Sequence, residues 1–180
     1  MNVVEGVADL LEHRRNRGPG ETGFVPTLGA LHEGHLSLVR RAKAENARAW
    51  VSIFVNPAQF NDPGDLERYP RTMDQDLALL ESAGCDLVFV PRDDEIYADG
   101  YRYRVTENEL SLALEGASRP GHFDGVLTVV LKLLLLTLPA RAYFGEKDFQ
   151  QLQLIEGLVH AFFLDTRIVR CPTVREPDGL

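Results

Sequence analysis

The sequence has few cysteines, which excludes a scaffold held together by disulfide bonds. Cys85 and Cys171 are the two cysteines among 180 residues, whereas small disulfide-bonded domains carry four or more in a short chain. Each of the two lies beside an apolar segment, which favours buried packing for both thiols. A reducing compartment is therefore the default, and we expect a cytoplasmic protein.

Long hydrophobic runs and a signal sequence are also missing. The longest mainly apolar stretch, residues 126–138, has 13 residues, contains Lys132 and ends at Pro139. Because a helix that spans a bilayer needs about 20 apolar residues, this stretch predicts a helix in the core of the protein. The N-terminus lacks the basic start and apolar run of a signal peptide. We therefore expect no membrane partner.

Positive charge is in the minority. The chain has 19 Lys and Arg against 27 Asp and Glu, which gives a formal net charge of −8. A general nucleic-acid-binding protein normally shows a basic face, so no nucleic-acid partner is expected, although one local basic pocket is compatible with this balance. With 44% hydrophobic residues, a chain of this length can form one domain with a substantial core.

Hydrophobic periodicity predicts strands and helices that alternate along the chain. The expected strands are residues 24–25, 50–55, 86–90, 101–106, 142–144 and 167–170. The expected helices are residues 7–17, 35–47, 108–114, 126–138 and 149–163, with one more that begins after Thr72. Segments 58–71 and 118–125 are expected to be loops. In the helix after Thr72, Asp74 and Asp76 favour acids at a helix N-terminus over metal ligands.

This order predicts a single α/β domain over residues 1–180, a Rossmann-like, doubly wound parallel sheet with right-handed crossovers. In such sheets ligands bind outside the carboxyl ends of the strands. Polar side chains follow three of the expected strands: His32 and His35 after the first, Asn56 and Gln59 after the second, and Lys147 and Gln151 after a later one. We therefore expect these three loops to meet over a single pocket.

The strongest local signal lies in residues 23–37, where a glycine-bearing turn at Gly29 leads into a helix start with His32 and His35. Helix starts expose unpaired backbone N–H groups and the positive end of the helix dipole, which suits a phosphate. Two imidazoles three residues apart face the same way and add donors. The alternatives are exposed or helix-capping histidines, and a metal site, for which no third His or Cys stands at a recognisable spacing.

Residues 26–35, Pro-Thr-Leu-Gly-Ala-Leu-His-Glu-Gly-His, resemble the His-x-Gly-His signature of the nucleotidyltransferase superfamily. A lone motif of this kind is a weak signal. Five further blocks in the expected order resemble, more narrowly, the pantoate–β-alanine ligase (pantothenate synthetase) family. These blocks are residues 51–60, 69–72, 114–123, 143–151 and 172–180.

The resemblance implies an enzyme that joins pantoate to β-alanine at the expense of ATP, through a pantoyl adenylate, with release of AMP and pyrophosphate. It also implies Mg²⁺ as a partner of the ATP phosphates, with few protein ligands of its own. A homodimer formed through this domain is implied as well, and the edge of residues 101–106 is a candidate for the pairing surface.

By the same resemblance, ATP is bound by two short runs of residues and by one residue near the end of the chain. The ATP-binding positions are Leu28, Gly29, Ala30, Leu31, His32, Glu33, Gly34, His35, Gly145, Glu146, Lys147, Asp148 and Val174. The catalytic positions are His32, His35 and Lys147, with His35 as the proton donor. Gln59 and Gln151 match pantoate-binding glutamines, and Gln59 also matches a β-alanine-binding position. Arg119 and His122 are expected on the triphosphate side.

The sequence departs from the family pattern in two places. Leu28 replaces the usual Met, an apolar exchange of similar volume. The family continues past the final Asp-Gly-Leu with a Ser-Ser-Arg-Asn loop and a C-terminal lid domain, and neither follows Leu180. We therefore expect an N-terminal domain that folds but is poorly active.

Two other functions stay open. One is another His-x-Gly-His nucleotidyltransferase, which would transfer a nucleotide and stop there. The other is a non-catalytic nucleotide-binding or dimerising module. A ligase needs a pocket for a small carboxylate beside the α-phosphate, so Gln59 and Gln151 favour the ligase.

Overall fold

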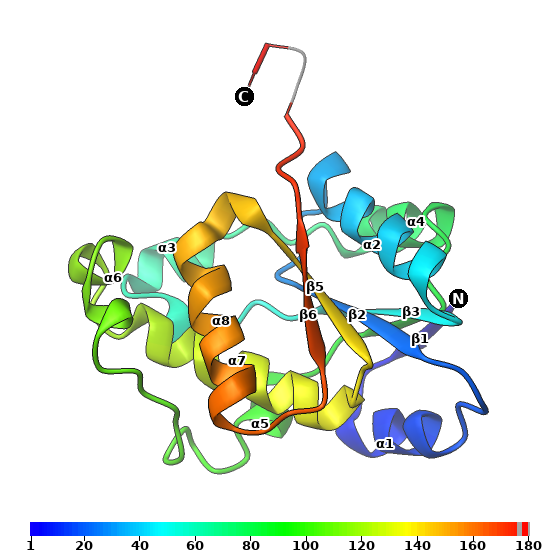
Figure 1. Cartoon of the computed structure of the whole chain (residues 1–180), viewed down its shortest axis with the longest axis horizontal. Helices are drawn as coiled ribbons and strands as arrows, with labels where there is room; N and C mark the ends of the chain where they lie inside the picture. Colours follow the sequence, from blue (N-terminus) through cyan, green and yellow to red (C-terminus); the bar gives the residue numbers. More distant parts are fainter. Residues whose placement is uncertain (176–177, 180) are drawn as a thin grey trace.

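The computed structural model describes residues 1–175 and 178–179, and these contain one six-stranded sheet (Figure 1). The strands are β1 (Asn2–Val4), β2 (Thr22–Thr27), β3 (Arg48–Ile53), β4 (Leu87–Phe89), β5 (Arg141–Gly145) and β6 (Arg167–Cys171). All of them run parallel, in the order β1-β4-β3-β2-β5-β6. The parallel, doubly wound sheet is confirmed. Positions 176, 177 and 180 of the last sequence block lie outside the described residues.

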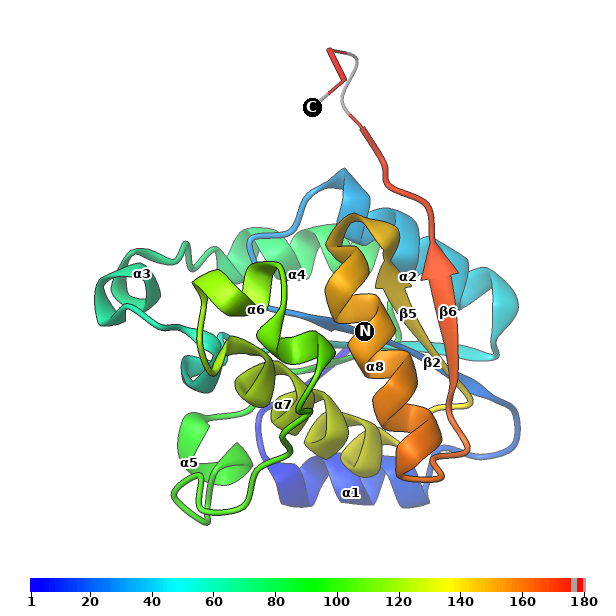
Figure 2. The same ribbon diagram turned by 60° about the vertical axis from the view of Figure 1, so that its left-hand side comes forward.

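Helices cover both faces of this sheet. The α-helices are α1 (Val7–Arg15), α2 (Glu33–Glu45), α3 (Pro63–Arg68), α4 (Met73–Ser82), α5 (Asp93–Ile96), α6 (Glu115–Ser118), α7 (His122–Thr137) and α8 (Phe149–Ala161). Short 3₁₀ helices are η1 (Pro57–Gln59), η2 (Leu110–Leu112) and η3 (Glu146–Asp148). Helices α1, α7 and α8 pack on one face, where Figure 2 shows α7 and α8 together, and α2 and α4 pack on the other.

The strands are almost continuously apolar because helices cover both faces of the sheet. Successive side chains of a strand point to opposite faces. Phe24 and Trp50 accordingly join the core under α7, whereas Val25 and Val51 join the core under α2. The apolar stretch of residues 126–138 lies in the buried α7, as expected, and no helix among the described residues is long and apolar enough to cross a membrane. Cys85 and Cys171 are buried and unpaired, also as expected.

The structure differs from the sequence-based assignments in four places. Residues 101–106 form no strand: Tyr101 has a φ of 59°, and the backbone N–H of Val105 donates to Thr128 Oγ1 (2.9 Å) on α7. The alternating pattern thus reflects an irregular segment with one side on a helix, and the proposed pairing edge is not a strand. The segment 58–71 contains α3, and α7 begins at His122, four residues earlier than expected. The short strand β1 was missed.

The strand order creates a crevice beside β2. From β2 the chain proceeds through β3 and β4 to one side of the sheet, and then returns to add β5 and β6 on the other side. The crossover helices therefore lie on opposite faces at the β2/β5 boundary. At such a point the loops that follow two neighbouring strands diverge and leave room for a ligand at the carboxyl ends.

Candidate active site

A cavity of about 400 Å³ lies at the carboxyl ends of β2 and β5, within the range of roughly 300–1,000 Å³ that is typical of small-molecule sites. It brings together residues from the segments that follow β2, β3, β5 and β6, from the segment before α4, and from α2, α7 and α8. The predicted site residues that line it are Leu28, His32, Gly34, His35, Gln59, Gly145, Lys147, Asp148, Gln151 and Val174. The expectation that separate crossover loops meet over one pocket, with His35 and Lys147 in the same cavity, is confirmed.

Other predicted residues do not line this cavity. Gly29, Ala30, Leu31, Glu33 and Glu146 are absent from its wall, and their role in ATP binding stays a prediction. Leu31 is part of the core under α2, and Glu33 forms an ion pair with an arginine on the outside of the same helix.

The two histidines cap helix α2 and face each other. His32 is the N-cap residue, and its Nδ1 accepts a hydrogen bond from the backbone N–H of Gly34 (3.1 Å). In return, His35 Nδ1 accepts from the backbone N–H of His32 (3.4 Å). The ring centroids are 4.1 Å apart. A capping role and a place in the cavity wall, which the sequence left as alternatives, are thus combined in the same pair.

This capping arrangement fixes where each imidazole carries its proton. Both Nδ1 atoms are acceptors, so the neutral rings of His32 and His35 hold their hydrogen on Nε2. Gly34 makes the arrangement possible, because a Cβ at this position would lie 2.8 Å from Cε1 of His32. The middle glycine of the His-x-Gly-His motif therefore accommodates the first imidazole, and the pair presents two Nε2–H donors.

The pKa of His35 falls from 6.5 to about 4, chiefly because burial disfavours the charged ring, and secondly because His32 lies beside it. The carboxylates of Asp76 and Asp148 oppose the shift, and the ammonium of Lys147 adds to it. At neutral pH His35 is therefore uncharged. In this state it is a hydrogen-bond donor through Nε2 and holds no second proton to give away.

The lowered pKa of His35 predicts that stability decreases in mild acid. Between pH 6.5 and about 4 the unfolded chain binds more protons than the folded one at this residue, so the free energy of unfolding rises with pH in that window. At 1.36 kcal/mol per pKa unit, the contribution is at most about 3 kcal/mol, present above pH 6.5 and lost as the pH falls to about 4. Urea unfolding at pH 5 and pH 7 measures the part of this contribution that is lost above pH 5. In His35→Asn, which retains an acceptor for the cap, the difference between the two pH values should shrink.

Four backbone N–H groups in and after the turn that precedes α2 bind to side chains of the protein. The carboxylate of Asp76 in α4 accepts hydrogen bonds from the N–H groups of Ala30 (2.9 Å) and Leu31 (2.8 Å), while those of His32 and Gly34 bind imidazoles. Asp76 is an acid in the first turn of α4, as expected, but the sequence did not indicate that it also binds the turn before α2. These four backbone N–H groups have partners inside the protein, and the imidazoles of His32 and His35 line the cavity and add donors to it.

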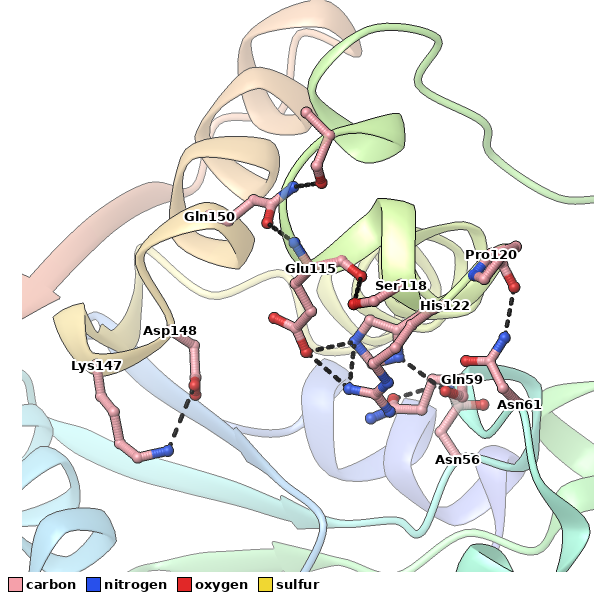
Figure 3. A network of polar contacts seen from close by, with 12 residues as sticks. Asn56, Gln59, Asn61, Glu115, Ser118, Pro120, His122, Lys147, Asp148 and Gln150 are labelled. Atoms are coloured by element: carbon pink, nitrogen blue, oxygen red, sulfur yellow. Dashed lines mark hydrogen bonds and ion pairs between the residues drawn. The ribbon is translucent and has the colours of Figure 1, made fainter.

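Lys147 and Asp148 lie in the part of the cavity wall where β5 ends in η3 (Figure 3). Lys147 Nζ lies 3.5 Å from Asp148 Oδ1, and the two side chains are 74% and 57% exposed. An exposed ion pair of this kind contributes little to stability. Its ammonium can therefore turn toward an anion in the cavity at little cost.

Gln59 is held in the wall by a network of buried polar groups. Its Oε1 accepts from Nδ2 of the fully buried Asn56 (3.0 Å), and its backbone carbonyl accepts from Nδ1 of His122 (2.7 Å) (Figure 3). Burial lowers the pKa of His122, so its ring is neutral and donates through Nδ1. Gly125 allows α7 to approach, because a Cβ there would lie 2.3 Å from the carbonyl oxygen of Ala58.

Arg119 and His122 were expected on the triphosphate side, but neither lines the main cavity. Arg119 pairs with Glu115, and its Nη1 lies 3.4 Å from His122 Nε2. His122 instead lines a smaller neighbouring cavity of about 210 Å³ on the other side of Gln59. Through its hydrogen bond to the backbone carbonyl of Gln59, His122 supports a residue that lines the main cavity.

Comparison with known proteins identifies the family. All 180 residues match the family model described as pantoate-beta-alanine ligase. The chain belongs to the pantoate–β-alanine ligase family. A pantothenate synthetase from Bdellovibrio bacteriovorus is 59% identical over 166 residues, which cover 92% of this chain and 66% of that protein. One from Coxiella burnetii (strain RSA 331) is 53% identical over 178 residues, which cover 99% and 69%. The chain thus spans about two thirds of the length of these curated relatives.

Solved structures of the pantoate–β-alanine ligase family share the fold. A crystal structure from Francisella tularensis, described as complexed with beta-gamma ATP and β-alanine, matches with a TM-score of 0.97 and 48% identity, over 100% of this chain and 70% of that one. A pantothenate synthetase structure from Thermus thermophilus matches with a TM-score of 0.93 and 49% identity, over 100% and 64%. The resemblance that the ordered sequence blocks indicated is confirmed.

Much of the cavity wall in this member of the pantoate–β-alanine ligase family was missed from the sequence. The additional lining residues, most of them apolar, are Pro26, Thr27, Leu38, Phe54, Tyr69, Val126, Val129, Val130, Leu133, Tyr143, Phe144, Pro172 and Thr173. The signal was present in α7, whose apolar residues exceed one helical stripe and so serve both the core and the cavity.

Proposed function

We propose that this chain carries the ATP- and pantoate-binding part of a pantoate–β-alanine ligase, with residues 1–180 as one Rossmann-like domain. The observation that supports it best is the cavity at the β2/β5 boundary, which is lined by two imidazole donors, an ammonium group and two glutamine amides. Family membership over the whole chain supplies the reaction, and the relative with a bound ATP compound and β-alanine supports the substrates.

In the first step a pantoate carboxylate oxygen attacks the α-phosphorus of ATP. The new carboxylate–phosphorus bond forms as the bond to the pyrophosphate oxygen breaks, which yields a pantoyl adenylate and pyrophosphate. Charge on the phosphate oxygens increases as pyrophosphate departs, so fixed donors on those oxygens lower the barrier. His32 and His35, through Nε2–H, and Lys147, through its ammonium, fill this role.

In the second step the amine of β-alanine attacks the acyl carbon. The new carbon–nitrogen bond forms, AMP leaves with the electron pair of the carbon–oxygen bond, and the amine loses a proton. Gln59 and Gln151 suit pantoate, because an amide can donate to a carboxylate and accept from a hydroxyl group. Gln59 would contact β-alanine as well, as the family pattern implies. Positioning of the two reactants over one wall supplies much of the rate enhancement.

Magnesium fits this site only as a partner of the nucleotide. Among the described residues there is no group of three or more His, Cys, Asp or Glu that could hold a metal ion. Mg²⁺ commonly binds through substrate phosphates, water and one or two carboxylates, and Asp148 at the cavity wall is such a carboxylate. When bound, the ion neutralises phosphate charge.

Two further proposals concern the oligomeric state and the cellular location of the enzyme. We propose a homodimer and a cytoplasmic location, the latter supported by two buried thiols that are not paired with each other. The homodimer rests on the family pattern alone, because residues 101–106 provide no strand for pairing.

Isotope exchange between pyrophosphate and ATP tests the proposed activity. We expect exchange that requires pantoate, because the adenylate must form before the reaction can reverse. The rate should be low for this chain and should rise when the C-terminal third of the Coxiella burnetii relative is appended. Release of AMP should then require β-alanine as well.

The competing functions predict other outcomes of the same experiment. Exchange that does not depend on pantoate would favour another nucleotidyltransferase. Binding of ATP with no exchange, even in the extended chain, would favour a non-catalytic module.

A further inference from the structure

Asp76 is a buried acid that reaches a distant part of the chain. It belongs to α4, in the crossover between β3 and β4, and is only 1% exposed. Its carboxylate accepts hydrogen bonds from the backbone N–H groups of Ala30 and Leu31 and from the hydroxyl group of Thr72 (3.2 Å). An acid placed only to favour a helix start would be exposed, as Asp74 is.

The turn held by Asp76 has an unusual backbone. Gly29 has a φ of +81° and Ala30 a φ of +51°, so two successive residues lie in the left-handed region, which disfavours alanine. A conformation of this kind persists only when its surroundings impose it. The two N–H groups held at 2.8 and 2.9 Å by one carboxylate provide that constraint.

The same carboxylate joins two walls of the cavity. On one side the turn leads directly into the N-cap residue His32 and so sets the position of both imidazoles. On the other side Thr72 follows the segment that carries Tyr69, which lines the cavity. Asp76 therefore lies between the phosphate-facing wall and the segment that precedes α4.

We propose that Asp76 is a positioning residue, whose buried carboxylate holds the left-handed turn at Gly29 and Ala30 and thereby places His32 and His35 in the cavity. Asp76 does not line the cavity itself. The effect on catalysis rests on the proposed ligase function, whereas the effect on the turn does not.

The replacement Asp76→Asn tests this proposal. An amide keeps the shape but has one acceptor oxygen, so at least one of the two N–H groups loses its partner. We expect the amide protons of Ala30 and Leu31 to exchange at least about tenfold faster, relative to those of β3. In the extended chain, we expect kcat to fall by about 10-fold or more, while the KM for pantoate changes less.

The titration of His35, followed by NMR, separates positioning from charge. The groups that act on its ring are His32, Asp76, Asp148 and Lys147, and burial has the largest effect. Removal of the Asp76 charge alone would lower the pKa of His35 further. A loosened turn would expose the ring and raise the pKa by about one unit or more. We expect the rise, and a pKa that stays at or below about 4 would overturn the proposal.

Two further variants complete the design. Asp74→Asn makes the same charge change at an exposed position in the first turn of α4, and it should alter none of these quantities. Thr72→Val keeps the carboxylate but removes its third hydrogen bond, and it should give the same changes as Asp76→Asn at a smaller size. If Asp76→Asn does not fold, unchanged exchange of the Ala30 and Leu31 amides in Thr72→Val would overturn the proposal. Because exchange and titration need no substrate, the result stands apart from the proposed activity.

Discussion

Replacement of His35 by alanine should lower the rate of pantoate-dependent pyrophosphate–ATP exchange by about 100- to 1,000-fold. Loss of one fixed donor from a site that stabilises developing charge typically has an effect of this size. His35 is neutral at pH 7 and its Nδ1 is engaged in the cap of α2, so its Nε2–H is the group that is lost. The decrease should lie mainly in kcat, because the charge on the phosphate grows after ATP has bound.

The matched control for this experiment is His13→Ala. His13 lies in α1, outside the cavity wall, and its removal should leave the exchange rate unchanged. Circular dichroism should show that both variants fold, since the hydrogen bond that His35 accepts in the cap is long, at 3.4 Å. A His35→Ala variant that retains more than about a tenth of the exchange rate would contradict the proposed role.

A single methyl group at Gly125 should both destabilise the fold and weaken pantoate binding. The new Cβ would lie 2.3 Å from the carbonyl oxygen of Ala58 and 2.7 Å from the backbone nitrogen of Gln59. Since backbone atoms cannot move aside as a flexible side chain can, η1 must shift away from α7. We expect about 1–3 kcal/mol lower free energy of unfolding and a higher KM for pantoate, measured by urea unfolding and by exchange assays.

Gly157→Ala is the control for this second substitution. Gly157 also lies within a helix, α8, but a Cβ there would meet no atom within 4 Å. Alanine has the higher helix propensity, so this variant should be more stable by about 0.5–1 kcal/mol, with pantoate binding unchanged. Equal effects of the two substitutions would show that the contact between α7 and η1 does not govern the position of Gln59.

The sequence predicted the order of the layers better than the details of the connections. Strands such as 50–55 are covered on both faces, so their apolar runs are distinct, and five of the six strands were located. The strand β1 was not predicted, because it has only three residues, of which Val4 alone is buried. The helix α3 was also not predicted, although Asp62 and Pro63 form a typical helix start. In the structure the Asp62 carboxylate accepts a hydrogen bond from the backbone N–H of Gly64 (2.8 Å).

At the site, sequence motifs identified the groups that face the cavity but not the groups that hold them. The positions of Lys147 and Gln151 relative to the histidine turn followed from topology, because the strands of a parallel sheet end at one edge. The hydrogen bonds between Asp76 and a turn 45 residues earlier depend on how α4 packs on α2, so the partners of Asp76 could not be identified from the sequence. A signal did exist: Asp76 precedes the buried Leu80 by one helical turn and so lies on the inward face of its helix.

The place of the cavity between β2 and β5 also affects how the protein folds. β2 pairs with β3, its near neighbour in the chain, but with β5 only across a connection of more than a hundred residues. Closure of so long a loop carries an entropy cost and tends to be slow. The cavity walls come from both sides of this junction, so a ligand of the cavity can bind only after the two halves of the sheet have met. On the proposed function, bound ATP stabilises the assembled state by mass action and does not stabilise partly folded forms.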